Sequence, residues 1–205
     1  MDAWFDIYSL TNTDERQELQ TEGLKESVGY VLDIVEKEIA LLDGRAERLF
    51  LGGMSQGMAT ILWTLLCSPI RLGGTRLGGV VAFCGWLPFA GQIEAIVESH
   101  PDSSAVDKST QVGRHLLKIL GYTPLQIEER EFDSVVSTPV FLSHGTDDAW
   151  VDVALGRQAR QLIRQMGIQT EWREYLGADN DGHWIKEPEG IDDLVRFLQS
   201  HAHIN

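Results

Sequence analysis

The chain of 205 residues has little basic charge and almost no cysteine. Lys and Arg number 17 against 31 Asp and Glu, which gives a net charge of −14. This charge repels phosphate backbones and anionic membrane surfaces, so we expect no nucleic-acid partner. Cys67 and Cys84 are far apart and have no histidine at metal-ligand spacing. We therefore expect reduced, buried thiols, no metal site and no cofactor.

Long apolar runs are also missing from the sequence. The first residues, MDAWFDIYSL, have neither a basic start nor an apolar stretch of signal-peptide length. No segment approaches the roughly 18 consecutive apolar residues that a membrane-spanning helix needs. We therefore expect a cytoplasmic protein without integral membrane association.

The hydrophobic periodicity predicts alternating helices and strands. Apolar residues between Leu24 and Leu42 recur at helical spacing, and further helical patterns lie in 58–69, 152–167 and 190–201. Short apolar runs bounded by Gly, Pro or Asp predict strands within 48–53, 77–88, 138–148 and 169–177. Strands that are apolar on both sides are typical of a parallel sheet covered by helices on both faces. The predicted fold class is therefore α/β.

The length and composition favour one domain over residues 1–205. Hydrophobic residues make up 43% of the chain and charged residues 23%, as in an ordinary globular domain, and no repeat or linker divides it. Residues 91–137 are more polar than their flanks. We expect this segment to form an excursion of one or two helices over one edge of the sheet.

The segment Gly53-Met54-Ser55-Gln56-Gly57 has the pattern G-x-S-x-G between an expected strand and an expected helix. This context is the one in which the pattern marks a nucleophilic serine on a sharp turn. Side chains at the two glycine positions are expected to collide as strand and helix close on each other. The alternatives are a glycine-rich loop without chemistry and a phosphate site at a helix N-terminus.

A nucleophilic serine needs a base and an orienting carboxylate, and both have candidates downstream. Asp147 and Asp148 follow the third expected strand, and His183 follows the fourth, so all lie at the sheet edge that carries Ser55. Alone, the two aspartates fit solvated turn residues better, and His183 fits a loop histidine as well as a base, whereas His144 is expected to pack at a strand end. The order Ser, Asp, His at successive strand ends nevertheless matches a hydrolase triad.

Several segments, in order, resemble the acyl-protein thioesterase, or phospholipase/carboxylesterase, family of α/β-hydrolases. They are WFDIYSL, LGGMSQGMAT, GWLP, HGTDDAWV and GHW, and the resemblance covers most of the chain outside 91–137. It implies Ser55 as nucleophile, His183 as base and Asp148 rather than Asp147 as the triad acid. The implied substrates are acylated proteins, lysophospholipids or small acyl esters. Trp86, Leu87 and Trp150 become candidate walls of an acyl groove, with aromatic packing as the alternative.

The sequence departs from the family before the WFDIYSL segment. Family members carry there a glycine-rich H-G-x-G-D-type loop that supplies one oxyanion donor, whereas the other donor is the backbone N–H of Gln56. We therefore expect a shortened member that lacks the usual first strands of the sheet. An unpaired sheet edge would also favour self-association into a homo-oligomer.

Two hypotheses follow for function. The first is a serine hydrolase that cleaves acyl thioesters or carboxylic esters with Ser55, Asp148 and His183. The second is a catalytically impaired, hydrolase-like protein that binds acyl groups or a protein partner, because the missing oxyanion donor costs on the order of 10²–10³ in turnover. The residue types leave open the acyl chain length and the choice between thioester and oxygen ester.

Overall fold

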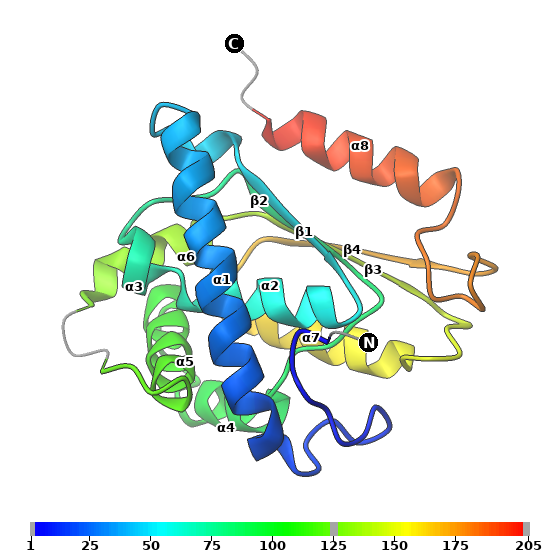
Figure 1. The fold of residues 1–205 in the computed structure, drawn as a ribbon, viewed down its shortest axis with the longest axis horizontal. Helices are drawn as coiled ribbons and strands as arrows, with labels where there is room; N and C mark the ends of the chain where they lie inside the picture. The colour runs from blue at the N-terminus through cyan, green and yellow to red at the C-terminus, as the bar shows by residue number, and fades with distance from the viewer. Residues whose placement is uncertain (1–2, 124–126, 203–205) are drawn as a thin grey trace.

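The computed structural model describes residues 3–123 and 127–202, and a parallel sheet forms their centre (Figure 1). The sheet has the strand order β1-β2-β3-β4, and every neighbouring pair is parallel. Its strands are β1 (Phe50–Met54), β2 (Gly79–Phe83), β3 (Val140–Gly145) and β4 (Thr170–Tyr175). The two central strands are buried along their whole lengths, as their continuous apolar sequences predicted.

Helices cover both faces of the sheet, which confirms the predicted α/β class. On one face α2 (Gln56–Cys67) packs against β1 and β2, and α7 (Val153–Gln165) packs against β3 and β4. The long helix α1 (Gln20–Leu41) lies on α2. Helix α8 (Glu189–His201) packs on the opposite face, against β2 and β3 (Figure 1).

The alternating side chains of the central strands divide the core into two parts. Val80 and Ala82 belong to the large cluster beneath α2 and α7. Val81 and Phe83 belong to the smaller cluster beneath α8, which includes Phe197. Because successive side chains of a strand point to opposite faces, both sides of β2 need cover, and the helices supply it.

The segment 91–137 is largely helical. It contains most of α4 (Ala90–Ser99), together with α5 (Ala105–Ile119) and the short α6 (Asp133–Ser137). Helix α5 packs on α2, and α4 packs on α7. The segment 91–137 therefore adds to the helical layer on one face of the sheet, whereas the sequence predicted that it lies over an edge of the sheet. The other short helices are α3 (Pro69–Leu72) and the 3-10 turns η1 (Gln17–Leu19), η2 (Ala46–Arg48) and η4 (Glu129–Phe132).

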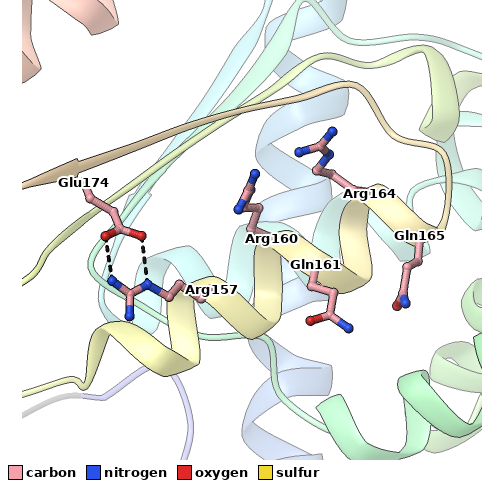
Figure 2. A pocket seen from close by; sticks show the side chains of 6 residues that line it. All are labelled: Arg157, Arg160, Gln161, Arg164, Gln165 and Glu174. Carbon is pink, nitrogen blue, oxygen red and sulfur yellow. Dashed lines mark hydrogen bonds and ion pairs between the residues drawn. The ribbon is translucent and has the colours of Figure 1, made fainter.

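The outer face of α7 carries three arginines along a groove of about 470 Å³ (Figure 2). Arg157 donates two hydrogen bonds to the carboxylate of Glu174 on β4, at 2.8 and 2.7 Å. Arg160 and Arg164 line the same groove, which includes neither Ser55 nor His183. This concentration of positive charge is local, because the chain as a whole is strongly acidic.

None of the helices within the described ranges is long and apolar enough to cross a membrane. Cys67 and Cys84 are both free and buried, as predicted. Burial raises the pKa of the Cys67 thiol well above its usual range, so this group stays protonated in the core beneath α1 and α2.

Candidate active site

Ser55 occupies a sharp turn between β1 and α2. Its backbone has φ 57° and ψ −124°, a conformation that L-residues rarely adopt. The Ser55 N–H donates to the carbonyl of Phe83 at the end of β2, at 2.9 Å, which fixes the turn to the sheet. Strained backbone of this kind is typical of functional sites, where the surrounding structure holds it.

The two glycines of the motif have different physical reasons. A Cβ at Gly53 would lie 2.4 Å from the carbonyl oxygen of Gly57, so only glycine lets strand and helix approach this closely. A Cβ at Gly57 would meet nothing within 4 Å. The predicted collision therefore exists at Gly53, and the expectation was wrong for Gly57, which faces open space beside Ser55.

Paired alanine substitutions test this difference. We expect Gly53→Ala to lower the free energy of unfolding by about 1–3 kcal/mol or more, because the added Cβ overpacks against backbone. Gly57→Ala is expected to be neutral or to stabilise by about 0.4–1 kcal/mol, because alanine favours the helix. Urea unfolding of both variants measures the difference. Equal destabilisation by the two changes would contradict this geometry.

The turn after β3 separates the two candidate aspartates. The carboxylate of Asp148 accepts a hydrogen bond from His183 Nδ1 at 2.7 Å, and its side chain is fully shielded from solvent. Its other oxygen accepts the backbone N–H groups of Trp150 and Val151, each at 2.9 Å. Asp147 instead accepts the N–H of Gly177 at 3.0 Å. The geometry therefore favours Asp148 as the partner of His183.

The loop after β4 brings His183 to this carboxylate through close backbone contact. A Cβ at Gly145 would lie 2.1 Å from the carbonyl oxygen of Gly182, and a Cβ at Gly182 would lie 2.7 Å from the backbone of Asp147. Gly182 also has φ +83°, which favours glycine. The carbonyl of Asp181 accepts the N–H of Ala149 at 3.0 Å, which ties the loop to the Asp148 turn.

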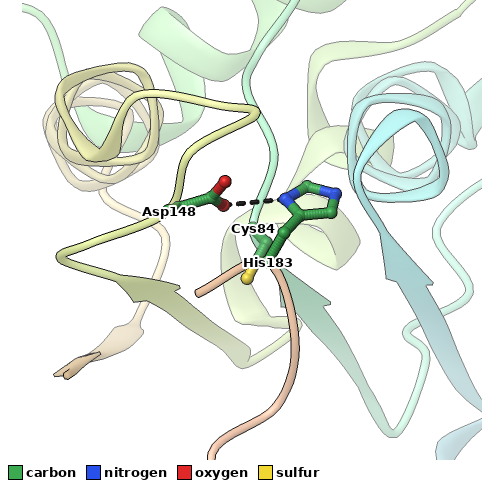
Figure 3. A group of neighbouring side chains, drawn as sticks. All are labelled: Cys84, Asp148 and His183. Carbon is green, nitrogen blue, oxygen red and sulfur yellow. Dashed lines mark hydrogen bonds and ion pairs between the residues drawn. The ribbon is translucent and has the colours of Figure 1, made fainter. Parts of the chain in front are cut away.

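The proton positions on His183 follow from its partner. A carboxylate only accepts, so His183 Nδ1 carries a proton toward Asp148, and in the neutral ring Nε2 keeps a lone pair. The second ring nitrogen points away from Asp148 (Figure 3). His183 is 8% exposed, and its ring is therefore nearly closed off from bulk water. Such a ring is suited to act as a general base.

No hydrogen bond joins Ser55 Oγ to His183 anywhere in residues 3–123 and 127–202. The structure therefore brings Asp148 and His183 into direct contact and places Ser55 at the same end of the parallel strands without that last link. Contacts between nucleophile and base often become short only when substrate is bound.

Cys84 lies beside this pair at the end of β2. Its sulfur, a ring nitrogen of His183 and a carboxylate oxygen of Asp148 lie within 4.8 Å of one another (Figure 3). Burial raises the pKa of the Cys84 thiol to about 11, which disfavours the thiolate that a metal would need. Both oxygens of Asp148 already accept hydrogen bonds. The cluster therefore fits a packed hydrogen-bonded site better than a metal site.

A groove of about 400 Å³ opens next to Ser55. Its apolar walls come from the N-terminal segment and from the loop after β2: Trp4, Ile7, Leu10 and Trp86. The Trp86 ring packs edge-on against Phe5, with centroids 6.1 Å apart. These walls can accommodate an apolar chain attached to a group at Ser55.

The three sequence candidates for the groove walls separate in the structure. Trp86 borders the groove beside Ser55, but it is only 1% exposed and belongs to the main hydrophobic core. Leu87 lies in the main hydrophobic core and does not line this groove, so its packing alternative is the correct one. Trp150 is 58% exposed and lines a neighbouring hollow of about 360 Å³ with Asp148 and Leu10. Leu10 lines both hollows.

The side chain of Gln56 clamps one wall of the groove, a contact that sequence reasoning missed. Gln56 Oε1 accepts the N–H of Trp4 at 3.1 Å, and Gln56 Nε2 donates to the carbonyl of Phe5 at 3.1 Å. At the first position of α2 its own backbone N–H has no acceptor within the helix and can reach a developing oxyanion. Gln56 thus links the groove wall to the turn that carries Ser55.

Removing the Gln56 side-chain bonds should release the amide of Trp4. We expect Gln56→Met to raise the exchange rate of the Trp4 amide roughly 2- to 10-fold, as loss of one hydrogen bond predicts. Gln56→Glu keeps the acceptor for the Trp4 N–H but loses the donor to the Phe5 carbonyl, so this amide should exchange more slowly than in the methionine variant. Hydrogen exchange followed by NMR measures the rates. An unchanged rate in the methionine variant would show that the clamp does not hold the wall.

Comparison with known proteins places this arrangement in a family context. Residues 1–109 match the family model described as Phospholipase/Carboxylesterase. The chain is 26% identical over 201 residues to acyl-protein thioesterase 1 of Candida albicans, covering 98% of the chain and 69% of that protein. It is 28% identical to carboxylesterase SOBER1 of Arabidopsis thaliana, covering 98% of the chain and 66% of that protein. The chain thus spans about two thirds of the length of these curated relatives.

Solved structures share the fold. The crystal structure of Arabidopsis thaliana SOBER1 superposes with a TM-score of 0.65 at 24% identity, covering 98% of the chain and 74% of that structure. Zea mays acyl-protein thioesterase 2 superposes with a TM-score of 0.63 at 24% identity, covering 98% and 72%. At this identity the likeness supports the α/β-hydrolase fold, independently of the sequence match.

Proposed function

Because the chain belongs to the phospholipase/carboxylesterase family, we propose that it is a serine hydrolase that cleaves acyl thioesters or carboxylic esters. Ser55 is the nucleophile, His183 the general base and Asp148 the residue that orients His183. The observation that carries this assignment is the 2.7 Å hydrogen bond between His183 Nδ1 and the buried Asp148 carboxylate, at the sheet edge that carries the Ser55 turn.

The reaction begins when Ser55 Oγ attacks the acyl carbonyl carbon. His183 Nε2 takes the hydroxyl proton, and Asp148 stabilises the resulting imidazolium. The backbone N–H of Gln56 donates to the developing oxyanion. His183 then returns the proton to the leaving thiol or alcohol, which leaves an acyl ester on Ser55.

The acyl-enzyme is then hydrolysed by the same groups in reverse order. Water loses a proton to His183 Nε2 and attacks the acyl carbon, and the proton returns to Ser55 Oγ as the carboxylic acid leaves. The apolar groove formed by Trp4, Ile7, Leu10 and Trp86 holds the acyl chain throughout. Burial of each CH₂ group there contributes about 0.8 kcal/mol to binding.

The substrate class follows from the groove and from the relatives. An apolar groove that ends at the nucleophile favours a fatty acyl group over a polar one. Relatives are named acyl-protein thioesterase and carboxylesterase. We therefore assign acylated proteins and small acyl esters as substrates, with a cytoplasmic site of action.

The alternative of a catalytically silent, acyl-binding protein has less support. A silent protein has no need of a buried carboxylate that accepts a hydrogen bond from a histidine, because desolvating that charge costs several kcal/mol. The strained Ser55 backbone also favours a catalytic role over a silent one.

Substitution of the nucleophile tests the proposal. We expect Ser55→Ala to lower kcat/KM for acyl esters and acyl thioesters by roughly 10³-fold or more, because no other group can form the acyl-enzyme. Ser99→Ala, on the exposed end of α4, serves as the matched control and should keep wild-type activity. Hydrolysis by the Ser55→Ala variant at the wild-type rate would refute the assignment.

A further inference from the structure

A second histidine, His144, lies against the Asp148 carboxylate. His144 ends β3, and its side chain is fully buried. Its Nε2 lies 3.2 Å from Asp148 Oδ2 and 2.9 Å from the carbonyl oxygen of Val151. Asp148 Oδ2 therefore has two imidazole neighbours, His183 and His144.

The contacts of His144 show which of its ring nitrogens carries the hydrogen. The Val151 carbonyl can only accept, so His144 Nε2 carries the hydrogen. Burial lowers the pKa of His144, which keeps the ring neutral at physiological pH. Nδ1 is then unprotonated, and no partner for it exists among the described residues. A buried neutral ring in this state can donate one hydrogen bond, from Nε2–H.

Helix α7 leaves room for the His144 ring at Gly156. A Cβ at Gly156 on α7 would lie 2.4 Å from His144 Nδ1, and the edge of Trp172 is 3.0 Å from the same position. Glycine inside a helix is less favourable than alanine. Here that cost is offset by room for an imidazole beside Asp148.

We propose that His144 is a positioning residue for Asp148. Its Nε2–H, which donates to the Val151 carbonyl and lies beside Asp148 Oδ2, ties the turn 148–151 to the end of β3. It also holds Oδ2 in place without relying on His183. The backbone N–H groups of Trp150 and Val151 fix only the other oxygen. The inference rests on the proposed function, because it assigns His144 to the orientation of the same base.

The first test uses the unmodified protein. NMR of ¹⁵N-histidine-labelled protein at neutral pH should show His144 as the neutral tautomer protonated at Nε2. The His183 Nδ1 proton should give a downfield, slowly exchanging resonance. Protonation of His144 at Nδ1 alone would overturn the proposal, since Nε2 would then donate nothing to Asp148.

The second test compares side chains of similar size. His144→Gln retains an N–H near the position of Nε2, whereas His144→Met retains only the bulk. We expect the methionine variant to lose roughly 10- to 100-fold in kcat with KM nearly unchanged, because His183 is no longer held in line. Its downfield His183 resonance should broaden. The glutamine variant should recover most of both signals.

A control separates positioning from general destabilisation. Val140→Ala creates a cavity at a buried position on the same strand and face as His144, away from Asp148. It should lower the free energy of unfolding and leave kcat and the His183 resonance unchanged. If His144→Met behaves like Val140→Ala, or His144→Gln is as impaired as His144→Met, the positioning role is refuted.

The two proposals fail in distinguishable ways. Absence of Ser55-dependent hydrolysis in the wild-type protein would remove the proposed function, while the NMR tautomer and the His183 resonance would still decide whether His144 orients Asp148. If His144→Met does not fold, the wild-type tautomer and the His144→Gln variant carry the test.

Discussion

The buried carboxylate of Asp148 is the constraint on which the candidate active site depends. A charge without solvent contact is stable only when polar groups surround it, because its desolvation costs several kcal/mol. Here two backbone N–H groups hold one oxygen, and His183 and His144 approach the other. Each charge-assisted hydrogen bond contributes about 1.5–3 kcal/mol, so the set offsets the burial. The same bonds orient the base, which makes stability and chemistry depend on one group.

Close backbone approach brings these groups together. Gly53 lets β1 meet α2, Gly145 and Gly182 let the His183 loop rest on the end of β3, and Gly156 makes room for His144. At each position a Cβ would lie within 2.7 Å of a neighbouring atom. The parallel sheet supplies the frame, because its strands all end at the same edge. The glycines then decide how tightly the loops at this edge can pack.

The sequence predicted the frame well because its signals are local. Continuous apolar runs identified β2 and β3, and the carboxyl ends of the parallel strands suggested Ser55, an aspartate at 147 or 148, and His183. The family resemblance then selected Asp148. Other features depend on contacts between distant segments. The Gln56 clamp joins residues 52 and 51 positions apart in the chain, and the His144 contact depends on a glycine in α7. Leu87 lies in the same core cluster as Trp86 but does not line the groove, and the residue types alone did not separate the two.

The central claim is that Ser55 is a nucleophile activated by His183. The most direct measurement is covalent labelling of the purified chain with a fluorophosphonate, followed by mass spectrometry of the peptide that carries the adduct. If Ser55 is the nucleophile, the protein carries one adduct, on Ser55. Labelling should fall sharply in a His183→Ala variant of unchanged fold. A folded wild-type protein that stays unlabelled, or that carries the adduct on another residue, would contradict it.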